Sequence, residues 1–126
     1  MPPAEPSSGT PAVSFRLEVL KKRAEFVRTS HAKRQGMPGI HLQARKRNAD
    51  EAIGIRVGFT CSKKVGNAVA RNRAKRRLRE VARQVLPTHG QDGWDYVLVG
   101  RKEITAGMPF NKLIADLSRA LKSIHS

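Results

Sequence analysis

An alternating apolar segment followed by a long basic one constrains the fold of this chain more than any other sequence feature. In residues 53–61, isoleucine, valine, phenylalanine and cysteine alternate with glycine and polar residues, which predicts a strand with one buried face. Residues 67–86 carry apolar side chains at helical spacing, and Pro87 and Gly90 end the predicted helix. Residues 94–101 predict another strand. The three segments together indicate a strand–helix–strand unit.

The flanking segments extend this unit into one small domain. Helical spacing of apolar residues predicts a first helix within residues 17–30, and alternation predicts a strand near residues 40–44. The glycines, proline and charged residues of 31–39 predict a loop between them, and Pro109 suits the first turn of a last helix with a continuous apolar stripe. We therefore expect an α/β (α+β) two-layer sandwich, with a mixed sheet of about four strands covered by helices.

The first fourteen residues differ in composition from the rest of the chain. Residues 1–14 hold four of the seven prolines together with serine and glycine, so we expect a disordered tail there and a folded domain over residues 15–126. The tail lacks the basic and apolar regions of a signal peptide, and no stretch is apolar enough to cross a membrane. These features predict a cytoplasmic protein with no membrane partner.

The acidic residues, histidines and cysteine form no pattern of a catalytic or metal centre. A protein metallonuclease needs clustered carboxylates for Mg²⁺, whereas here the one adjacent pair, Asp50 and Glu51, lies in a predicted surface turn. The four histidines lack metal-ligand spacing and are expected at the surface. Cys61, the only cysteine, is expected to be a small core residue. We expect no catalytic residue, no protein-held metal and no small-molecule substrate.

The net charge of the chain indicates a polyanionic partner. Lys and Arg number 25 against 10 Asp and Glu, which gives a formal net charge of +15. Such an excess destabilises the compact state through self-repulsion unless a partner neutralises it. Nucleic acid is the polyanion that such proteins most often bind.

The positive charge concentrates on one face of the predicted 67–86 helix. Its apolar face is formed by Ala70, Ala74, Leu78, Val81, Ala82 and Val85. Its opposite face is formed by Asn72, Arg73, Lys75, Arg76, Arg79 and Arg83. Arg71 and Arg77 lie at the borders, and Glu80 is the only acid of the helix. Because like charges at helical spacing repel one another, we interpret this face as a phosphate-binding surface rather than a solvated one.

The segment just before this helix is a second candidate anion site. It contains Lys63, Lys64, Gly66 and Asn67, and the free backbone N–H groups of a helix start attract anions. The alternative interpretation is a simple turn in which Asn67 caps the helix.

These residues resemble a known family, the bacterial ribonuclease P protein component. Residues 56–79, RVGFTCSKKVGNAVARNRAKRRLR, strongly resemble its signature, and the Arg-Asn-Arg triplet of residues 71–73 is its hallmark. Residues 20–26, LKKRAEF, are similar to its first helix, and residues 95–102, DYVLVGRK, to its last strand. The resemblance covers residues 17–124.

The resemblance implies a fold, an activity and partners. Family members form an α/β sandwich with a central cleft and a left-handed strand–helix–strand crossover. They are accessory subunits of an endoribonuclease. Each binds the catalytic ribonuclease P RNA and the 5′ leader of precursor tRNA and promotes removal of that leader. The RNA carries the active site and binds most of the Mg²⁺.

The resemblance also assigns roles to individual residues. Adding Arg77 and Arg83 from the helical face, the predicted RNA-binding set is Lys63, Lys64, Asn67, Arg71, Asn72, Arg73, Lys75, Arg76, Arg77, Arg79 and Arg83. Phe26 matches an aromatic residue of the leader cleft. This chain has Ser30 and Gln43 where the family often has further aromatic residues, so we expect leader contact to depend on Phe26, Gln43 and Arg45.

Two other functions fit the same charge. A structured-RNA-binding module, such as a ribosomal protein or an RNA chaperone, would share the basic helix without promoting leader cleavage. A DNA-binding regulator would lay that helix in the major groove, but the sequence shows no helix-turn-helix partner and the helix is backed by a sheet.

Overall fold

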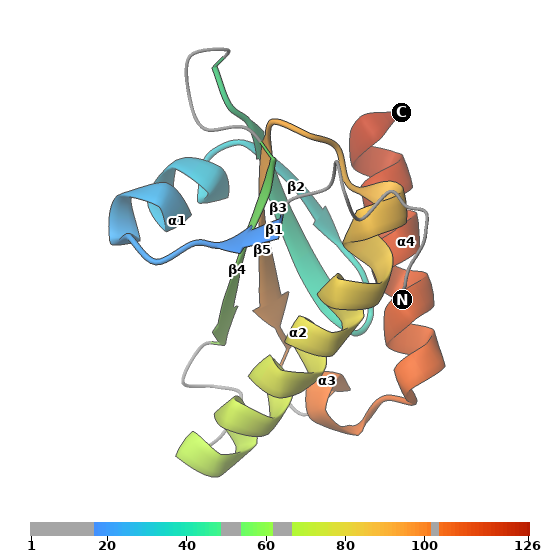
Figure 1. Cartoon of the computed structure of the whole chain (residues 1–126). Helices are drawn as coiled ribbons and strands as arrows, with labels where there is room; N and C mark the ends of the chain where they lie inside the picture. The colour runs from blue at the N-terminus through green and yellow to red at the C-terminus, as the bar shows by residue number, and fades with distance from the viewer. Residues whose placement is uncertain (1–16, 49–53, 62–66, 102–103) are drawn as a thin grey trace, which may run out of the picture.

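The computed structural model describes residues 17–48, 54–61, 67–101 and 104–126. Within these residues the elements in chain order are β1 Leu17–Val19, α1 Arg23–Ser30, β2 Lys33–Gly36, β3 Ile40–Lys46, β4 Ile55–Cys61, α2 Ala68–His89, β5 Trp94–Gly100, α3 Ile104–Gly107 and α4 Phe110–His125 (Figure 1). The predicted tail lies outside the described residues, so the domain start at residue 15 stays a prediction. None of the helices described is long and apolar enough to span a membrane.

The strands form one mixed sheet in the order β1-β4-β5-β3-β2. β4 pairs in parallel with both β1 and β5, whereas β3 pairs antiparallel with β5 and β2. In this register Gly58, Val97, Gln43 and Arg34 lie side by side across four strands. Paired residues share a face of the sheet, so these four side-chain positions face the same way.

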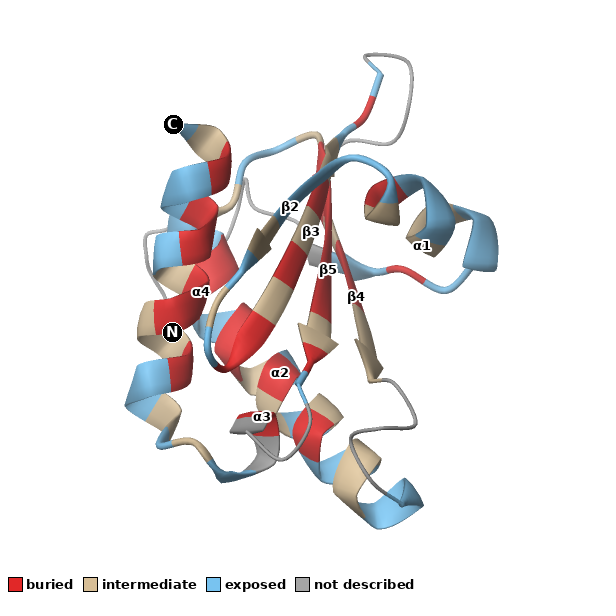
Figure 2. Ribbon diagram, turned by 180° about the vertical axis from the view of Figure 1, so that it is seen from behind, coloured by how far each residue is buried: buried red, intermediate tan, exposed pale blue. Residues whose placement is uncertain are grey.

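The connection from β4 through α2 to β5 is left-handed. In Figure 1 both strands run downward, α2 lies in front of the sheet and β5 lies to the right of β4, and Figure 2 shows the same arrangement from behind. Crossovers between parallel strands are right-handed in about 98% of cases. The hand that the family resemblance implies is therefore the one observed, against the general rule.

The core lies between the sheet and the pair of helices α2 and α4. Their apolar stripes pack on inward-facing strand residues, with Tyr96 and Leu98 of β5 at the centre. Leu113, Leu117 and Leu121 of α4 are fully buried, as the predicted apolar stripe requires. Each such side chain stabilises the fold by about 1.5–3 kcal/mol through burial. The short helix α1 packs on the opposite face, which is otherwise uncovered by helices (Figure 2).

Two strands were not predicted, so the sheet has five strands rather than about four. β1 occupies residues expected to begin the first helix, and β2 occupies part of the expected 31–39 loop. Leu17 and Val19 of β1 owe their extended form to parallel pairing with Ile55 and Val57. Such short edge strands depend on a distant partner, which local periodicity does not reveal.

The helices also differ from the prediction at their ends. α1 begins only at Arg23, and its apolar residue Val27 is exposed. α2 continues to His89 with Pro87 inside its last turn, and the Gly90 N–H donates to the Leu86 carbonyl 2.9 Å away. The proline removes one hydrogen bond near the end, where the helix has few bonds left to lose.

Candidate nucleic-acid interface

The solvent-facing side of α2 carries the predicted cationic residues. Five of the predicted residues are exposed there: Asn72, Arg73, Arg76, Arg79 and Arg83. The apolar residues Ala74, Leu78, Val81, Ala82 and Val85 are buried against the sheet and α4. The division of the helix into two faces is therefore as the spacing predicts. Glu80, its one acid, pairs with Arg83 at 3.1 Å, but both side chains are largely exposed and such a pair contributes little. The face keeps a strong positive charge.

The border positions of α2 contact other elements. Nε of Arg77 donates to the Thr105 carbonyl at 3.0 Å, its NH2 donates to the Met108 carbonyl, and its guanidinium lies over the Phe110 ring. Arg77 thus joins α2 to α3 and to the start of α4, a structural role that the sequence did not indicate. Arg71, the other border residue, is half-buried. Lys75 is half-buried too, although the spacing predicts it on the exposed face.

The start of α2 is capped as predicted. The Asn67 side-chain oxygen accepts a hydrogen bond from the Ala70 N–H at 3.0 Å. Lys63 and Lys64 lie outside the described residues, and their predicted RNA contact stays a prediction.

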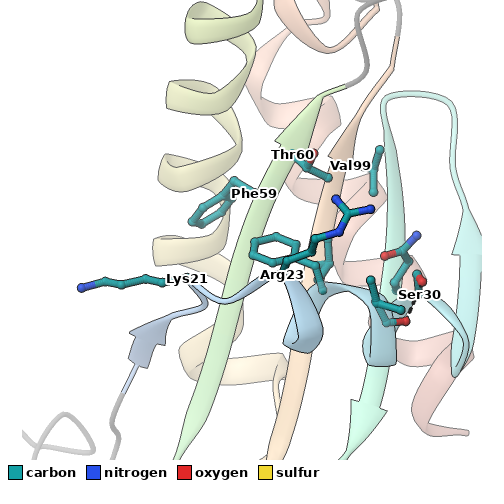
Figure 3. A pocket seen from close by; sticks show the side chains of 10 residues that line it. Lys21, Arg23, Ser30, Phe59, Thr60 and Val99 are labelled. Atoms are coloured by element: carbon teal, nitrogen blue, oxygen red, sulfur yellow. Dashed lines mark hydrogen bonds between the residues drawn. The ribbon is translucent and has the colours of Figure 1, made fainter.

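A groove of about 550 Å³ lies on the sheet face that α2 and α4 leave uncovered (Figure 3). It is lined by Lys21, Arg23, Phe26, Val27, Ser30, Gln43, Phe59, Thr60, Val97 and Val99. The structure thus brings the predicted leader residues Phe26 and Gln43 together. Figure 3 shows Arg23 extending from α1 over this groove, so apolar walls are combined with positive charge. This combination suits unpaired bases and their phosphates.

Gly58 sets the position of Phe26 in this groove. A Cβ built on Gly58 would lie 2.5 and 2.6 Å from Phe26 Cε1 and Cζ, and 3.2 Å from Leu20 Cβ. The ring therefore packs directly on the backbone of β4, at a point where only glycine leaves room. A glycine inside an otherwise regular strand was the one sequence signal that pointed to this close approach.

Replacing Gly58 by alanine is expected to displace Phe26 and to lower the free energy of unfolding by about 1–3 kcal/mol, because the added methyl group overlaps the ring. Denaturant unfolding gives the stability, and the NMR signals of the Phe26 ring report its displacement. Gly107→Ala is the control, since a Cβ at this exposed glycine would meet nothing within 4 Å. Phe26 signals that stay unchanged in Gly58→Ala would contradict this account.

The groove adjoins the basic face of α2 at the free edge of β4. Beyond Val57 no described strand pairs with the outer edge of β4, and the half-buried Phe59 lies there. The Arg79 guanidinium lies 5.7 Å from the centre of the Phe59 ring, within cation–π range. The cationic helix and the groove are thus parts of one continuous surface.

A buried ionic cluster holds α1 against the sheet, and the sequence did not reveal it. Asp95 of β5 is fully buried and accepts hydrogen bonds from Arg47 at 2.6 Å and from Arg56 at 2.8 and 2.9 Å. Arg56 also donates to Glu25 of α1 at 2.8 Å. Because α1 carries Phe26, this cluster supports one wall of the groove. The only sequence signal was a carboxylate inside an otherwise apolar strand.

Arg45, the third predicted leader residue, lies on the same sheet face but is not part of the groove lining. Its NH1 is 3.6 Å from Asp95 Oδ2, and its side chain is mostly buried. The structure therefore associates Arg45 with the ionic cluster, and its contact with a leader stays a prediction.

The histidines and the cysteine lie in different environments from one another. His31 and His89 are exposed as expected, whereas His41 and His125 are half-buried, which corrects the surface assignment for these two. The Tyr96 hydroxyl and His125 Nε2 are 2.7 Å apart, an internal contact.

Cys61 is half-buried at the end of the apolar face of β4, and burial raises the pKa of its thiol. No group of three or more metal-ligating side chains occurs among the described residues.

The fold and this surface define a class: a small α+β protein with a basic helix beside an open sheet groove, suited to binding nucleic acid. A family model described as Ribonuclease P matches residues 16–125. The chain belongs to the ribonuclease P protein family, whose members are components of a nuclease that processes tRNA.

Curated relatives and solved structures agree with this assignment. A protein of Ruegeria pomeroyi named "Ribonuclease P protein component" is 59% identical over 126 residues, covering 100% of this chain and 98% of the relative. The protein of that name in Paramagnetospirillum magneticum is 51% identical over 115 residues, 89% of this chain and 86% of its own length. The RNase P protein structure from Staphylococcus aureus has a TM-score of 0.67 at 27% identity, covering 84% of this chain and 94% of that one. The RNase P protein structure from Thermotoga maritima also has a TM-score of 0.67 at 27% identity, covering 86% of this chain and 99% of that one.

Proposed function

We propose that this chain binds the catalytic RNA of ribonuclease P and the 5′ leader of precursor tRNA, and so promotes endonucleolytic removal of the leader. The observation that carries the proposal is the continuity of two surfaces. The basic face of α2 meets the groove where Arg79 lies over Phe59. One surface can therefore contact a structured RNA while the other holds a single strand.

The chemistry of the two surfaces supports a different RNA ligand for each. The exposed arginines of α2 offer guanidinium groups that bind phosphates bidentately, which suits a folded RNA backbone. The groove offers the Phe26 ring for base stacking and Gln43 for hydrogen bonds. We assign the RNA subunit to α2 and the leader to the groove.

In this proposal the protein is an accessory subunit and the RNA performs the hydrolysis. The described residues contribute binding and orientation of the leader, and the Mg²⁺ that the reaction needs is bound mainly by the RNA. By arranging cations beside the leader, the protein raises substrate affinity in the cytoplasm at low magnesium.

A reconstitution tests the proposal directly. Precursor tRNA labelled at its 5′ end is incubated at low magnesium with ribonuclease P RNA, with and without this protein, and with protein alone. We expect cleavage at the mature 5′ end only when RNA and protein are both present. Tight RNA binding without stimulated cleavage would overturn the proposal and favour a structured-RNA-binding module. Cleavage by protein alone would place the catalyst in the protein.

A further inference from the structure

Three basic side chains converge on the open sheet face beyond the described lining of the groove. Arg34 of β2 and His41 of β3 lie on the face that carries Gln43 and Val99, because His41 pairs with Val99 and Arg34 pairs with Gln43. Arg101 directly follows β5, and its NH1 approaches Gly36, the β2 residue that pairs with His41. Three separate segments thus bring cationic or titratable groups to one place.

Gly36 leaves an opening between two of these groups. A Cβ built on Gly36 would lie 3.6 Å from His41 Nδ1 and 3.8 Å from Arg101 NH1. These are ordinary contact distances, so both side chains border the space that a side chain at Gly36 would occupy. Because glycine leaves that space empty, an anion lying outward from the Gly36 backbone can approach both groups.

The three side chains have no acidic counterpart in the described part of the chain. None of the ion pairs given by the structure among described residues includes Arg34, His41 or Arg101. Glu25 pairs with Arg56, and Asp95 pairs with Arg45, Arg47 and Arg56. Burial, followed by the charges of Arg101 and Arg34, lowers the pKa of His41. Uncompensated positive charge is therefore concentrated here.

We propose that Arg34, His41 and Arg101 form a phosphate-binding subsite at the β2 end of the groove. The inference rests on the proposed function, since the ligand is a phosphodiester of the same single strand whose bases occupy the groove. Gln43 and Val99 line the groove and pair with Arg34 and His41 of the subsite. A nucleic-acid strand that leaves the groove at this end therefore passes over the subsite. The imidazole of His41 becomes a second donor and a cation when a phosphate is bound.

The test uses the reconstituted holoenzyme and precursor tRNAs that each carry one neutral methylphosphonate linkage in the leader. With the native protein, we expect one linkage whose neutralisation weakens substrate binding about 10-fold. The double variant Arg34→Ala/Arg101→Ala should bind the unmodified precursor about 10-fold more weakly and be insensitive to that linkage. Arg119→Ala/Lys122→Ala, which removes the same charge from the exposed side of α4, is the control and should keep the sensitivity.

A pH series gives an independent readout for His41. Because a bound phosphate favours the imidazolium, the leader-dependent part of binding should strengthen as pH falls from about 7.5 to 5.5. His41→Asn should remove this dependence, whereas mature tRNA without a leader gives the baseline at each pH. Gly36→Asp should weaken leader binding as the double variant does, because its carboxylate would occupy the opening.

The outcomes separate the subsite from the function on which it rests. If the native holoenzyme binds precursor and mature tRNA equally well, the leader groove itself is wrong. If leader-dependent binding is present but the double variant keeps both its affinity and its linkage sensitivity, only the subsite is wrong. A pH dependence that persists in His41→Asn would likewise remove His41 from it.

Discussion

Replacing Asp95 by alanine is expected to lower the free energy of unfolding by about 3–5 kcal/mol, because it leaves the guanidinium of Arg47 buried without its carboxylate. The Arg47 side chain is fully buried and also donates to the carbonyls of Trp94 and Gly54, so it cannot move into water without breaking both hydrogen bonds. Such a loss is a large part of the total stability of about 5–15 kcal/mol of an ordinary domain. Urea unfolding followed by circular dichroism measures it.

Two further variants make this prediction specific. Asp95→Asn keeps the shape of the side chain but removes the charge, and it should still be destabilised by several kcal/mol. Asp92→Ala, at an exposed position near the start of β5, should change stability by less than about 0.5 kcal/mol. An Asp95→Asn protein as stable as the native one would show that the cluster contributes no net stabilisation. Since Arg56 joins Asp95 to Glu25 of α1, the variant should also weaken leader binding.

The triple variant Arg73→Ala/Arg76→Ala/Arg79→Ala is expected to weaken binding to ribonuclease P RNA about 100-fold or more near 0.15 M salt. All three side chains are exposed on α2, and alanine favours helices, so the fold should be retained. The slope of log affinity against log salt concentration should fall in magnitude by about 2–3, since each lost phosphate contact removes about one unit. Filter binding over a salt series gives both quantities.

A charge-matched variant on α4 separates a specific surface from net charge. Lys112→Ala/Arg119→Ala/Lys122→Ala removes the same three charges from exposed positions of a helix on which we place no RNA contact. It should lower the affinity for ribonuclease P RNA less than about 10-fold. The slope of log affinity against log salt concentration should stay close to that of the native protein. Equal losses in the two triple variants would mean that net charge, and not the face of α2, determines binding.

The basic helix is the part of the molecule that local sequence predicted best. Amphipathic spacing repeats within each turn, so Ala74, Leu78 and Val81 could be placed in the core and Arg73 and Arg76 in solvent from the sequence alone. The same holds for the buried stripe of α4 and for strands β3, β4 and β5. Five of the predicted RNA-binding residues are exposed on α2, while Arg77 also holds α3 and α4 in place.

The groove was predicted only in part. Phe26 and Gln43 were expected there through the family resemblance, but Phe59, Val97 and Val99 were not. These residues meet because β3, β4 and β5 pair in one register, and that register is set by contacts between segments far apart in the chain. The histidines show the same limit, since the half-buried positions of His41 and His125 follow from packing that no spacing rule describes.

The sequence by itself determined the elements whose periodicity is local: the alternating strands, the two long amphipathic helices, the cationic face and the membership of the family. Only the tertiary structure revealed the short edge strands β1 and β2, the Asp95 cluster and the packing of Phe26 on Gly58. The physical reason is distance along the chain. Asp95 meets Arg47 across 48 residues and Arg56 meets Glu25 across 31, so these interactions exist only once the sheet has formed.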